Sequence, residues 1–239
     1  MRRIAPLFAL LAALLAACAR PAEPTPVPTP TPTPREISAA IGRATQASQS
    51  VHFAVSLSGA PVPLDATGLT VLNAMEGDLK RPDAVLALLD VTVGGAVAEI
   101  RTVSLEGRQY ITNPITRAWQ CLDPGAAFDP AVLFAPDGGI EALLQDGLDE
   151  VELVGVEELD GRPSYHLRGS IAGEKLQPIS GGLLGAGPVQ VELWADQETL
   201  RASRLQLTDA AADPAAPTVW TLTFSDYDKA VEVRAPIAC

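Results

Sequence analysis

The stretch VQVELWADQETLRASRLQLTD, residues 189–209, contains two runs in which apolar and polar side chains alternate around a short polar break. Alternation with a period of two places successive side chains on opposite faces of a β-strand. The break falls near Asp196 to Thr199, and two strands joined by so short a turn pair antiparallel. The stretch therefore predicts a β-hairpin with one apolar face.

The same pattern recurs on both sides of this hairpin. Gly94-Gly95 and Asp160-Gly161 are turn signals between runs of strand-forming residues, and a further turn is expected at Asp226 to Lys229, between two strands. We expect about five strands before a helical insert and about six after it. The stretches that carry the pattern are VHFAVSLSG (51–59), LTVLNAMEGDLK (69–80), AVLALLDVTVGG (84–95), AVAEIRTVSLEG (96–107), RQYITNPITRAWQCL (108–122), VELVGVEELDGRPSYHLRGSI (151–171) and TVWTLTFSDYDKAVEVRAP (218–236).

Helical periodicity is found in fewer places. Residues 35–50 predict a helix, 129–136 and 138–148 predict two short helices, and 173–188 is irregular or briefly helical. A sheet of so many strands curls rather than staying flat. The prediction is an α+β fold, with one curled antiparallel sheet of about 10–11 strands and helices packed on its concave face around an apolar cavity.

The N-terminus predicts export. Arg2 and Arg3 precede an apolar run over residues 4–17 that is shorter than the roughly 20 residues of a membrane span. Leu15-Ala16-Ala17-Cys18 resembles the lipobox of bacterial lipoproteins, which implies that Cys18 is lipidated. The alternatives are an ordinary secretory signal with an accidental cysteine, or a simple membrane anchor.

A proline- and threonine-rich segment follows the cysteine. Alternating proline favours an extended chain, so this segment reads as a spacer. We therefore expect a signal peptide at 1–17, a lipidated cysteine and linker at 18–34, and one domain at 35–239.

The amino-acid composition limits the classes of partner that the protein can bind. The formal net charge is −12, which excludes the basic surface that nucleic acid requires and disfavours binding to anionic membranes through surface charge. Hydrophobic residues make up 47% of the chain but aromatic residues only 5%. Such aliphatic side chains suit either a lining for acyl chains or an ordinary core. The lipid anchor is the expected attachment to a membrane, and the domain is expected to be a monomer.

Residues suited to catalysis are scarce. The two histidines, His52 and His166, fall on the polar face of strands and are predicted to lie on the surface. No cluster of metal-ligating residues and no Gly-x-Ser-x-Gly motif is found, and the acidic segment at 146–152 lacks the spacing of a calcium loop. We therefore predict no metal, no cofactor and no enzymatic activity.

Two cysteines remain after Cys18. In an exported protein an even pair is more often a disulfide than two free thiols. Cys121 and Cys239 are the predicted partners.

The order of these pieces resembles the LppX/LprG-type lipoproteins of mycobacteria and their relatives, whose half-barrel is related to the LolA and LolB carriers. The resemblance rests on the lipobox at Cys18, the first helix and SVHFAVSLSG (50–59), RQYITNPITRAWQCLDP (108–124), GVEELDGRPSYHLRGSI (155–171), VELWADQETLRASRLQL (191–207) and WTLTFSDYDKAVEVRAP (220–236). It implies a U-shaped antiparallel sheet, helices on its concave side and an apolar cavity between them. It also implies binding of acylated lipids or glycolipids and a part in moving them to the cell surface.

The predicted function is passive carriage of such a lipid or glycolipid between membrane and envelope, with a membrane transporter or acceptor protein as a further partner. The predicted cavity residues are Ile41, Val55, Leu57, Val71, Met75, Leu143, Leu144, Leu148, Leu183, Leu184, Val191, Leu193, Leu205, Leu207, Leu222 and Phe224. The alternative is an envelope sensor or protein-interaction module in which the same half-barrel is filled by its own side chains. Cavity volume distinguishes the two, because a carrier needs many hundreds of Å³ and a module packs to normal density. A periplasmic binder of polar solutes is a third reading, but it would need convergent charged or aromatic groups.

Overall fold

The structure is a computed structural model that describes residues 31–65, 67–123, 125–211 and 213–239. Pro32–Cys239 forms one compact unit. The predicted signal segment, Cys18 and most of the linker lie outside the described residues. Among the helices in the described part, none has both the length and the apolar character needed to cross a membrane.

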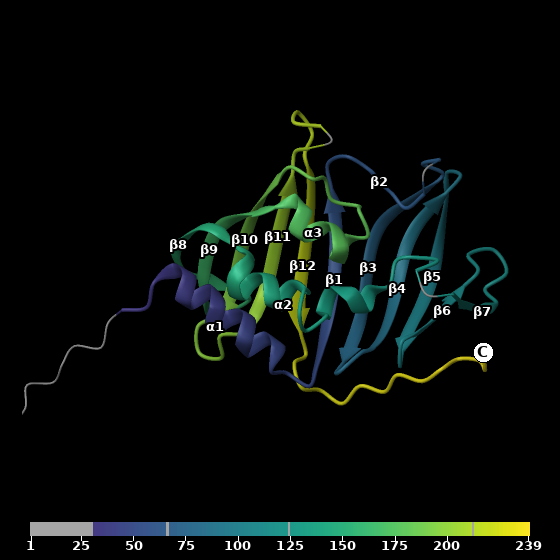
Figure 1. Cartoon of the computed structure of the whole chain (residues 1–239), viewed down its shortest axis with the longest axis horizontal. Helices are drawn as coiled ribbons and strands as arrows, with labels where there is room; N and C mark the ends of the chain where they lie inside the picture. Colours follow the sequence, from purple (N-terminus) through teal and green to yellow (C-terminus); the bar gives the residue numbers. More distant parts are fainter. Residues whose placement is uncertain (1–30, 66, 124, 212) are drawn as a thin grey trace, which may run out of the picture. The chain divides into compact units, whose positions relative to one another are not determined.

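Twelve strands form one antiparallel sheet (Figure 1). The order across it is β7-β6-β5-β4-β3-β1-β12-β11-β10-β9-β8, with the short β2 paired to β3. Almost every strand therefore lies beside its neighbour in the sequence, as the turn signals predict. The strands are β1 Ser50–Ser58, β2 Val62–Pro63, β3 Thr70–Lys80, β4 Ala84–Val93, β5 Ala96–Leu105, β6 Arg108–Thr112, β7 Trp119–Leu122, β8 Asp149–Leu159, β9 Arg162–Ala172, β10 Pro188–Asp196, β11 Ala202–Asp209 and β12 Thr218–Ser225.

The pairing of β1 with β12 joins the two halves of the sheet. Phe53 lies opposite Phe224 and Val55 opposite Leu222, so apolar side chains from both halves share one face. All four side chains are buried. The first and last strands of the chain thus form the centre of the sheet, which no local sequence pattern indicates.

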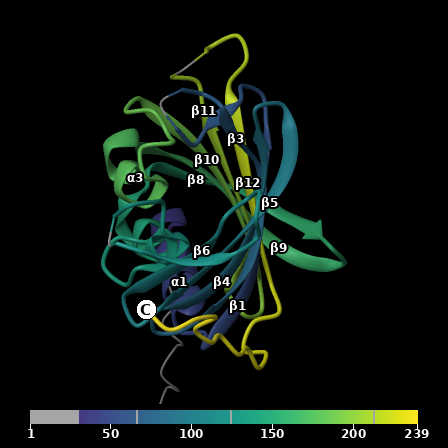
Figure 2. The ribbon, with the colours of Figure 1, turned by 90° about the vertical axis from the view of Figure 1, so that its right-hand side faces the viewer.

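The helices lie together on one side of the curved sheet (Figure 2). They are α1 Pro34–Gln46, the 3₁₀ helix η1 Pro130–Phe134, α2 Ile140–Ala142, which continues as the π-helical turn η2 Leu143–Gly147, and α3 Gly173–Ser180. One hydrophobic core fills the space between these helices and the sheet. The predicted curled antiparallel sheet with helices on its concave face is confirmed.

Helix α1 begins with a capping box. The Thr33 hydroxyl accepts a hydrogen bond from the Glu36 N–H, and the Glu36 carboxylate accepts one from the Thr33 N–H at 2.7 Å. This backbone hydrogen bond lowers the pKa of Glu36.

Helix α1 packs closely on α2 at Gly42. A Cβ at this position would lie 2.5 Å from the Glu141 carbonyl oxygen, so only glycine lets the two helices approach this closely.

The predicted last strand is wrong. After β12 the chain turns at residues 226–229, but residues 229–239 form no strand. They run past the ends of the neighbouring strands toward the far edge of the sheet (Figure 1). Strand β12 is already paired on both sides, by β1 and by β11, so a returning strand would find no free backbone groups beside it.

The C-terminal segment ends in a disulfide between Cys239 and Cys121, with the two Cα atoms 5.9 Å apart. Cys121 lies in β7, the strand at one edge of the sheet. The two cysteines are 118 residues apart in the sequence. The bond therefore ties the C-terminus to the half of the sheet that the N-terminal strands form. The predicted pairing is confirmed.

A buried ion pair joins the helices to the sheet. Arg81 follows β3, and its Nη2 lies 2.6 Å from Oε1 of Glu141 in α2. Its Nε donates to the Ser48 carbonyl at 2.9 Å. Only 1% of the Glu141 side chain is exposed, and its Oε2 has no hydrogen-bond partner among the described residues. Burial raises the pKa of this carboxyl, against the opposing effect of Arg81.

The raised pKa predicts a pH dependence of stability. Over the range between the two pKa values the folded protein holds a proton on Glu141 that the unfolded chain has released, so Glu141 adds stability below its ordinary pKa of 4.5 and loses it as pH rises through the folded pKa. Relative to Glu141→Gln, we expect the free energy of unfolding of the wild type to fall as pH rises from about 4 to about 7. Urea unfolding of both proteins across this range measures the difference, and a difference independent of pH would contradict the prediction.

Candidate functional site

An apolar pocket lies between the sheet and the helices. Its volume is about 40 Å³, and Ser180 is the single polar residue among those that line it. The sheet contributes Val55, Leu72, Met75, Leu207, Trp220 and Leu222, and the helices and their loops contribute Phe128, Leu133, Ile140, Ile179, Ser180, Leu183 and Leu184. The pocket is an opening within the core, floored by the central strands and roofed by η1, α2, α3 and the loop that follows α3.

Strand alternation supplies most of the floor. Val55, Leu207 and Leu222 each occupy the core-facing positions of a strand whose other positions are more exposed. In β3 a bulge between Leu72 and Ala74 shifts this alternation by one residue. Leu72 and Met75 both face the pocket for that reason.

The predicted cavity residues fall into two groups. The pocket brings together Val55, Met75, Leu183, Leu184, Leu207 and Leu222. The others do not line it. Ile41, Leu144, Leu148, Val191, Leu193, Leu205 and Phe224 are buried elsewhere in the same core, and Leu57 and Leu143 are half-buried against it. Val71 is half-buried as well, because the bulge in β3 gives its expected place to Leu72.

Several lining residues were not predicted. Trp220 alternates with Leu222 and Phe224 along β12, so the period of two would have found it. Phe128, Leu133 and Ile179 come from the roof, and their segments contain no period that marks a pocket-facing side chain. Only the packing of η1 and α3 over the sheet identifies them.

The cover of the pocket is α3 with the glycine-rich loop 181–187. Gly181 ends α3 in the left-handed conformation, with φ 60°, which favours glycine. The Gly173 N–H donates to the Gly187 carbonyl at 3.0 Å, which closes the loop on the start of the helix. The Gly185 N–H donates to Oδ2 of Asp209 at 2.7 Å, which fastens the loop to the end of β11. A few hydrogen bonds thus hold the cover in place.

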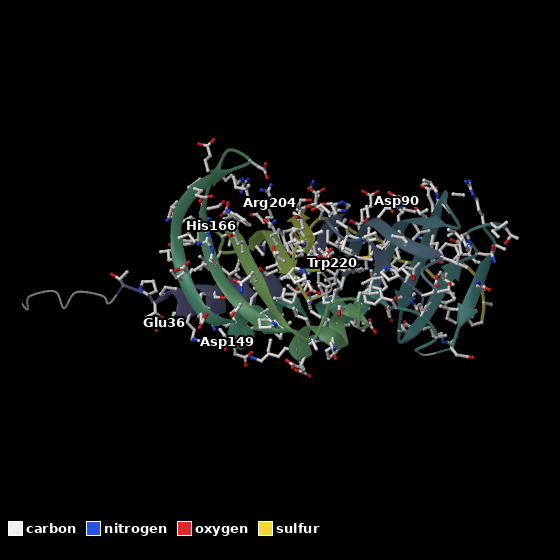
Figure 3. All side chains as sticks on the ribbon, turned by 90° about the horizontal axis from the view of Figure 1, so that it is seen from above. Glu36, Asp90, Asp149, His166, Arg204 and Trp220 are labelled. Carbon is white, nitrogen blue, oxygen red and sulfur yellow. A yellow bond between two sulfur atoms is a disulfide. The ribbon has the colours of Figure 1, made fainter. Side chains whose placement is uncertain are left out.

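The outer face of the sheet carries a polar cluster. The prediction that both histidines lie on the surface is wrong for His166, which is 5% exposed. Its ring stacks on Trp194 at 4.3 Å, its Nδ1 lies 2.8 Å from Glu157 Oε1, and its Nε2 lies 3.1 Å from Glu192 Oε2. The hydrogen bond with His166, followed by one from Trp194, lowers the pKa of Glu157. In Figure 3 His166 lies on the side of the sheet away from the helices.

A polar hollow of about 660 Å³ lies at the end of the sheet near the turn between β10 and β11. Its cations are already paired with acids. Arg162 lies 3.2 Å from Asp196, Lys229 lies 2.6 Å from Asp226, and Arg201 pairs with Asp228 beside the hollow. Among the described residues, no group of three histidine, cysteine or acidic side chains is placed to hold a metal ion.

The profile of the LppX_LprAFG lipoproteins matches residues 33–233. The chain belongs to this family. It is 26% identical over 200 residues to the lipoarabinomannan carrier protein LprG of Mycolicibacterium smegmatis, covering 81% of this chain and 79% of that protein. It is also 26% identical over 194 residues to LprG of Mycobacterium tuberculosis, covering 80% and 77% of the two chains.

Two solved structures of LppX_LprAFG lipoproteins share the fold. LprF from Mycobacterium bovis superposes with a TM-score of 0.67 at 17% identity, over 88% of this chain and all of that one. LppX from Mycobacterium tuberculosis superposes with a TM-score of 0.60 at 15% identity, over 84% and 98% of the two chains.

Proposed function

We propose that this LppX_LprAFG lipoprotein binds an acylated lipid or glycolipid in the pocket beneath α3 and carries it between the membrane and the cell envelope. The observation that carries the proposal is the lining, where a single serine interrupts an otherwise hydrophobic wall. The name of the LprG relatives supports a glycolipid as the ligand class. A diacylglyceryl group on Cys18 would hold the protein on the membrane, with the linker as a spacer.

The pocket must open before it can accept an acyl chain. Its 40 Å³ is far below the roughly 300–1,000 Å³ of an ordinary small-molecule site. Burying each methylene contributes about 0.8 kcal/mol, so ten methylenes contribute about 8 kcal/mol. Breaking the two hydrogen bonds that fasten the loop costs about 1 kcal/mol each, and exposing the buried Ile179 and Leu184 side chains of the cover costs about 1.5–3 kcal/mol each. Burial of one acyl chain is therefore comparable with the cost of displacing the cover.

The direct test is the identity of what the protein binds. We would purify residues 32–239, which include the whole core and the disulfide, after expression in a bacterium that exports them, and record native mass spectra before and after organic extraction. The expected result is a mass excess that corresponds to an acylated lipid. A protein that stays at its sequence mass after incubation with membrane-lipid vesicles would contradict the proposal.

If the cover must move for lipid to leave, loosening it should raise the rate of lipid release. Asp209 is buried, and its carboxylate accepts hydrogen bonds from the Gly185 N–H at 2.7 Å and the Ala211 N–H at 2.8 Å. Asp209→Ala removes both, and loss of the bond that fastens the cover, worth about 1 kcal/mol, is expected to let lipid leave the pocket about fivefold faster. Transfer of a fluorescent acyl lipid to acceptor vesicles measures this rate.

The matched control is Asp196→Ala. Asp196 also accepts two backbone hydrogen bonds, from Glu198 and Thr199, but at the opposite end of β11. We expect it to leave the exchange rate unchanged. Equal acceleration in both variants would mean that general loosening of the sheet, and not release of the cover, controls exchange.

The small volume favours one other function. An interaction module or envelope sensor would keep its half-barrel packed, as a pocket of about 40 Å³ nearly does. Under that function the native mass spectrum stays free of lipid, and pocket variants leave partner binding intact. The same mass measurement therefore separates the two functions.

A further inference from the structure

One end of the sheet is formed by loops that contain almost no charged residues. Four connections meet there: the loop from β1 through β2 to β3, the β4–β5 turn, the loop after α3 and the β11–β12 loop (Figure 1). We call this surface the apolar end, and it comprises residues 59–69, 94–97, 181–187 and 210–217. The charged residues in these loops are Asp65 and Asp213.

Both of these acids are bound by their own loops. The Asp65 carboxylate accepts hydrogen bonds from the Thr67 N–H at 2.9 Å and the Thr70 N–H at 2.8 Å. The Asp213 carboxylate accepts one from the Ala215 N–H at 2.9 Å. Each carboxylate therefore has partners in the backbone beside it.

The opposite end of the sheet is charged. Four turns join neighbouring strands there, at residues 81–83, 106–107, 160–161 and 197–201. Their charged residues are Arg81, Asp83, Glu106, Asp160, Glu198 and Arg201. In a chain of net charge −12, the two ends of the sheet thus differ sharply in how they interact with water.

The apolar end exposes two large aliphatic side chains. Leu69 is 61% exposed and Val97 is 80% exposed. They lie on adjoining connections, because the Gly94 N–H donates to the Leu69 carbonyl at 2.9 Å. Single exposed aliphatic residues are common, but two on adjoining loops of an uncharged surface point to an interaction site.

The apolar end adjoins the pocket. Leu72, Leu207 and Trp220 line the pocket, and each lies three residues along its strand from one of these loops. Leu183 and Leu184 line the pocket from within the loop that follows α3. Whatever lies against this end is therefore next to the place where an acyl chain would enter beneath the cover.

The composition of the apolar end favours a bilayer over a protein as its partner. Its loops contain no Tyr, Trp, Phe, Met or Arg, the residue types that are enriched at protein interfaces. They contain no Lys or Arg to attract anionic headgroups. A neutral lipid surface needs neither, and it accepts aliphatic side chains.

The depth of the uncharged layer also fits a bilayer surface. The exposed Glu99 lies two residues after Val97 on β5, about 7 Å along the strand. Segments that lie in the membrane interface bury their apolar side chains by about 5–10 Å. Val97 can therefore reach the boundary between headgroups and acyl chains while Glu99 stays in the headgroup layer.

The predicted anchor at Cys18 permits this contact. Sixteen residues separate Cys18 from Pro34, the first residue of α1, and a chain of that length reaches at most about 55 Å. Strand β3, with eleven residues, is only about 36 Å long. The tether is therefore long enough for either end of the sheet to face the membrane.

We propose that the apolar end docks on the surface of a neutral bilayer, with Leu69 and Val97 at the boundary between headgroups and acyl chains, and so brings the pocket to the lipid. The docking itself does not depend on what the pocket binds. Its use in loading the pocket rests on the proposed function.

Hydrogen exchange of the anchored chain tests the docking. The disulfide occupies Cys121 and Cys239, so in residues 18–239 the Cys18 thiol is free to couple to a maleimide lipid. We would couple it to neutral phosphatidylcholine vesicles and compare amide exchange with that of the same chain, its thiol blocked, in solution. Exchange in the apolar end is expected to slow about tenfold, the effect of docking for about 90% of the time. Exchange in the turns of the opposite end is expected to stay unchanged.

Two double variants make the test specific. Leu69→Ser with Val97→Ser is expected to abolish the slowing. Val154→Ser with Val156→Ser is the matched control, because these side chains are 43% and 51% exposed on β8, the strand at one edge of the sheet. All four side chains are exposed, so both variants are expected to fold, and the control should keep the slowing.

The outcomes separate docking from lipid carriage. No slowing in the wild type, or equal slowing in Leu69→Ser with Val97→Ser, overturns the inference, while native mass spectra still decide whether lipid is carried. Slowing that appears without vesicles and grows with protein concentration assigns the apolar end to a second copy of the chain, and also overturns it. If the apolar end docks but the native spectra stay free of lipid, docking stands and the proposed function fails.

Discussion

Leu207→Trp is expected to weaken lipid binding about 100-fold while the protein stays folded. Leu207 is 5% exposed and lies in the floor of the pocket, contributed by β11. The larger side chain would occupy the space of roughly four methylenes of the ligand, and at about 0.8 kcal/mol each this loss is about 3 kcal/mol. Displacement of a fluorescent acyl lipid gives the dissociation constants of the two proteins.

Leu205→Trp is the control for this substitution. Leu205 lies two residues away on the same face of β11 and is equally buried, but it does not line the pocket. Both substitutions overpack the core at a cost of about 1–3 kcal/mol. Thermal unfolding should therefore shift similarly in both, whereas only Leu207→Trp should lose binding. Wild-type affinity in a folded Leu207→Trp variant would place the lipid elsewhere.

Replacement of both disulfide cysteines by serine is expected to lower the free energy of unfolding by about 4–5 kcal/mol, the chain-entropy value for a loop of 118 residues. The loop is long because it runs from β7 at the edge of the sheet to the last residue of the chain. Guanidinium unfolding of the double variant, beside the wild type with and without reductant, measures the effect.

Reduction of the wild type should reproduce most of this loss, which gives an internal control. The segment after β12 should also become more accessible to protease, because residues 229–239 belong to no strand and the disulfide holds their end. A variant with the wild-type free energy of unfolding would show that other contacts of this segment hold it in place.

Several features of the fold follow from the sequence alone. The period of two in β10 and β11 marks both strands and their apolar face, and Asp160-Gly161 marks the turn between β8 and β9. The disulfide follows because Cys121 and Cys239 are the only cysteines after Cys18. These are local patterns or unique pairs, so each needs no knowledge of the rest of the structure.

The residues that line the candidate pocket can be predicted from the sequence only in part. The sequence marks Leu205 and Leu207 alike as inward-facing, yet only Leu207 lines the pocket. The difference depends on where η1 and α3 cover the sheet. The alternation along a strand shows which face a side chain is on, but not which helix lies over it. The bulge at Leu72 and Ala74 is also invisible to a period of two, because it breaks that period.

The sequence by itself determined the fold class, the hairpins and the chemistry of the interior, because alternation, turn residues and composition act within a few residues of each other. Only the tertiary structure decided the rest. It placed β1 beside β12, so that β12 had no free side for a last strand, and it left the Trp220 N–H unpaired among the described residues of the core. Such features depend on contacts between residues far apart in the chain, and those contacts exist only once the sheet and its helices have packed around the core.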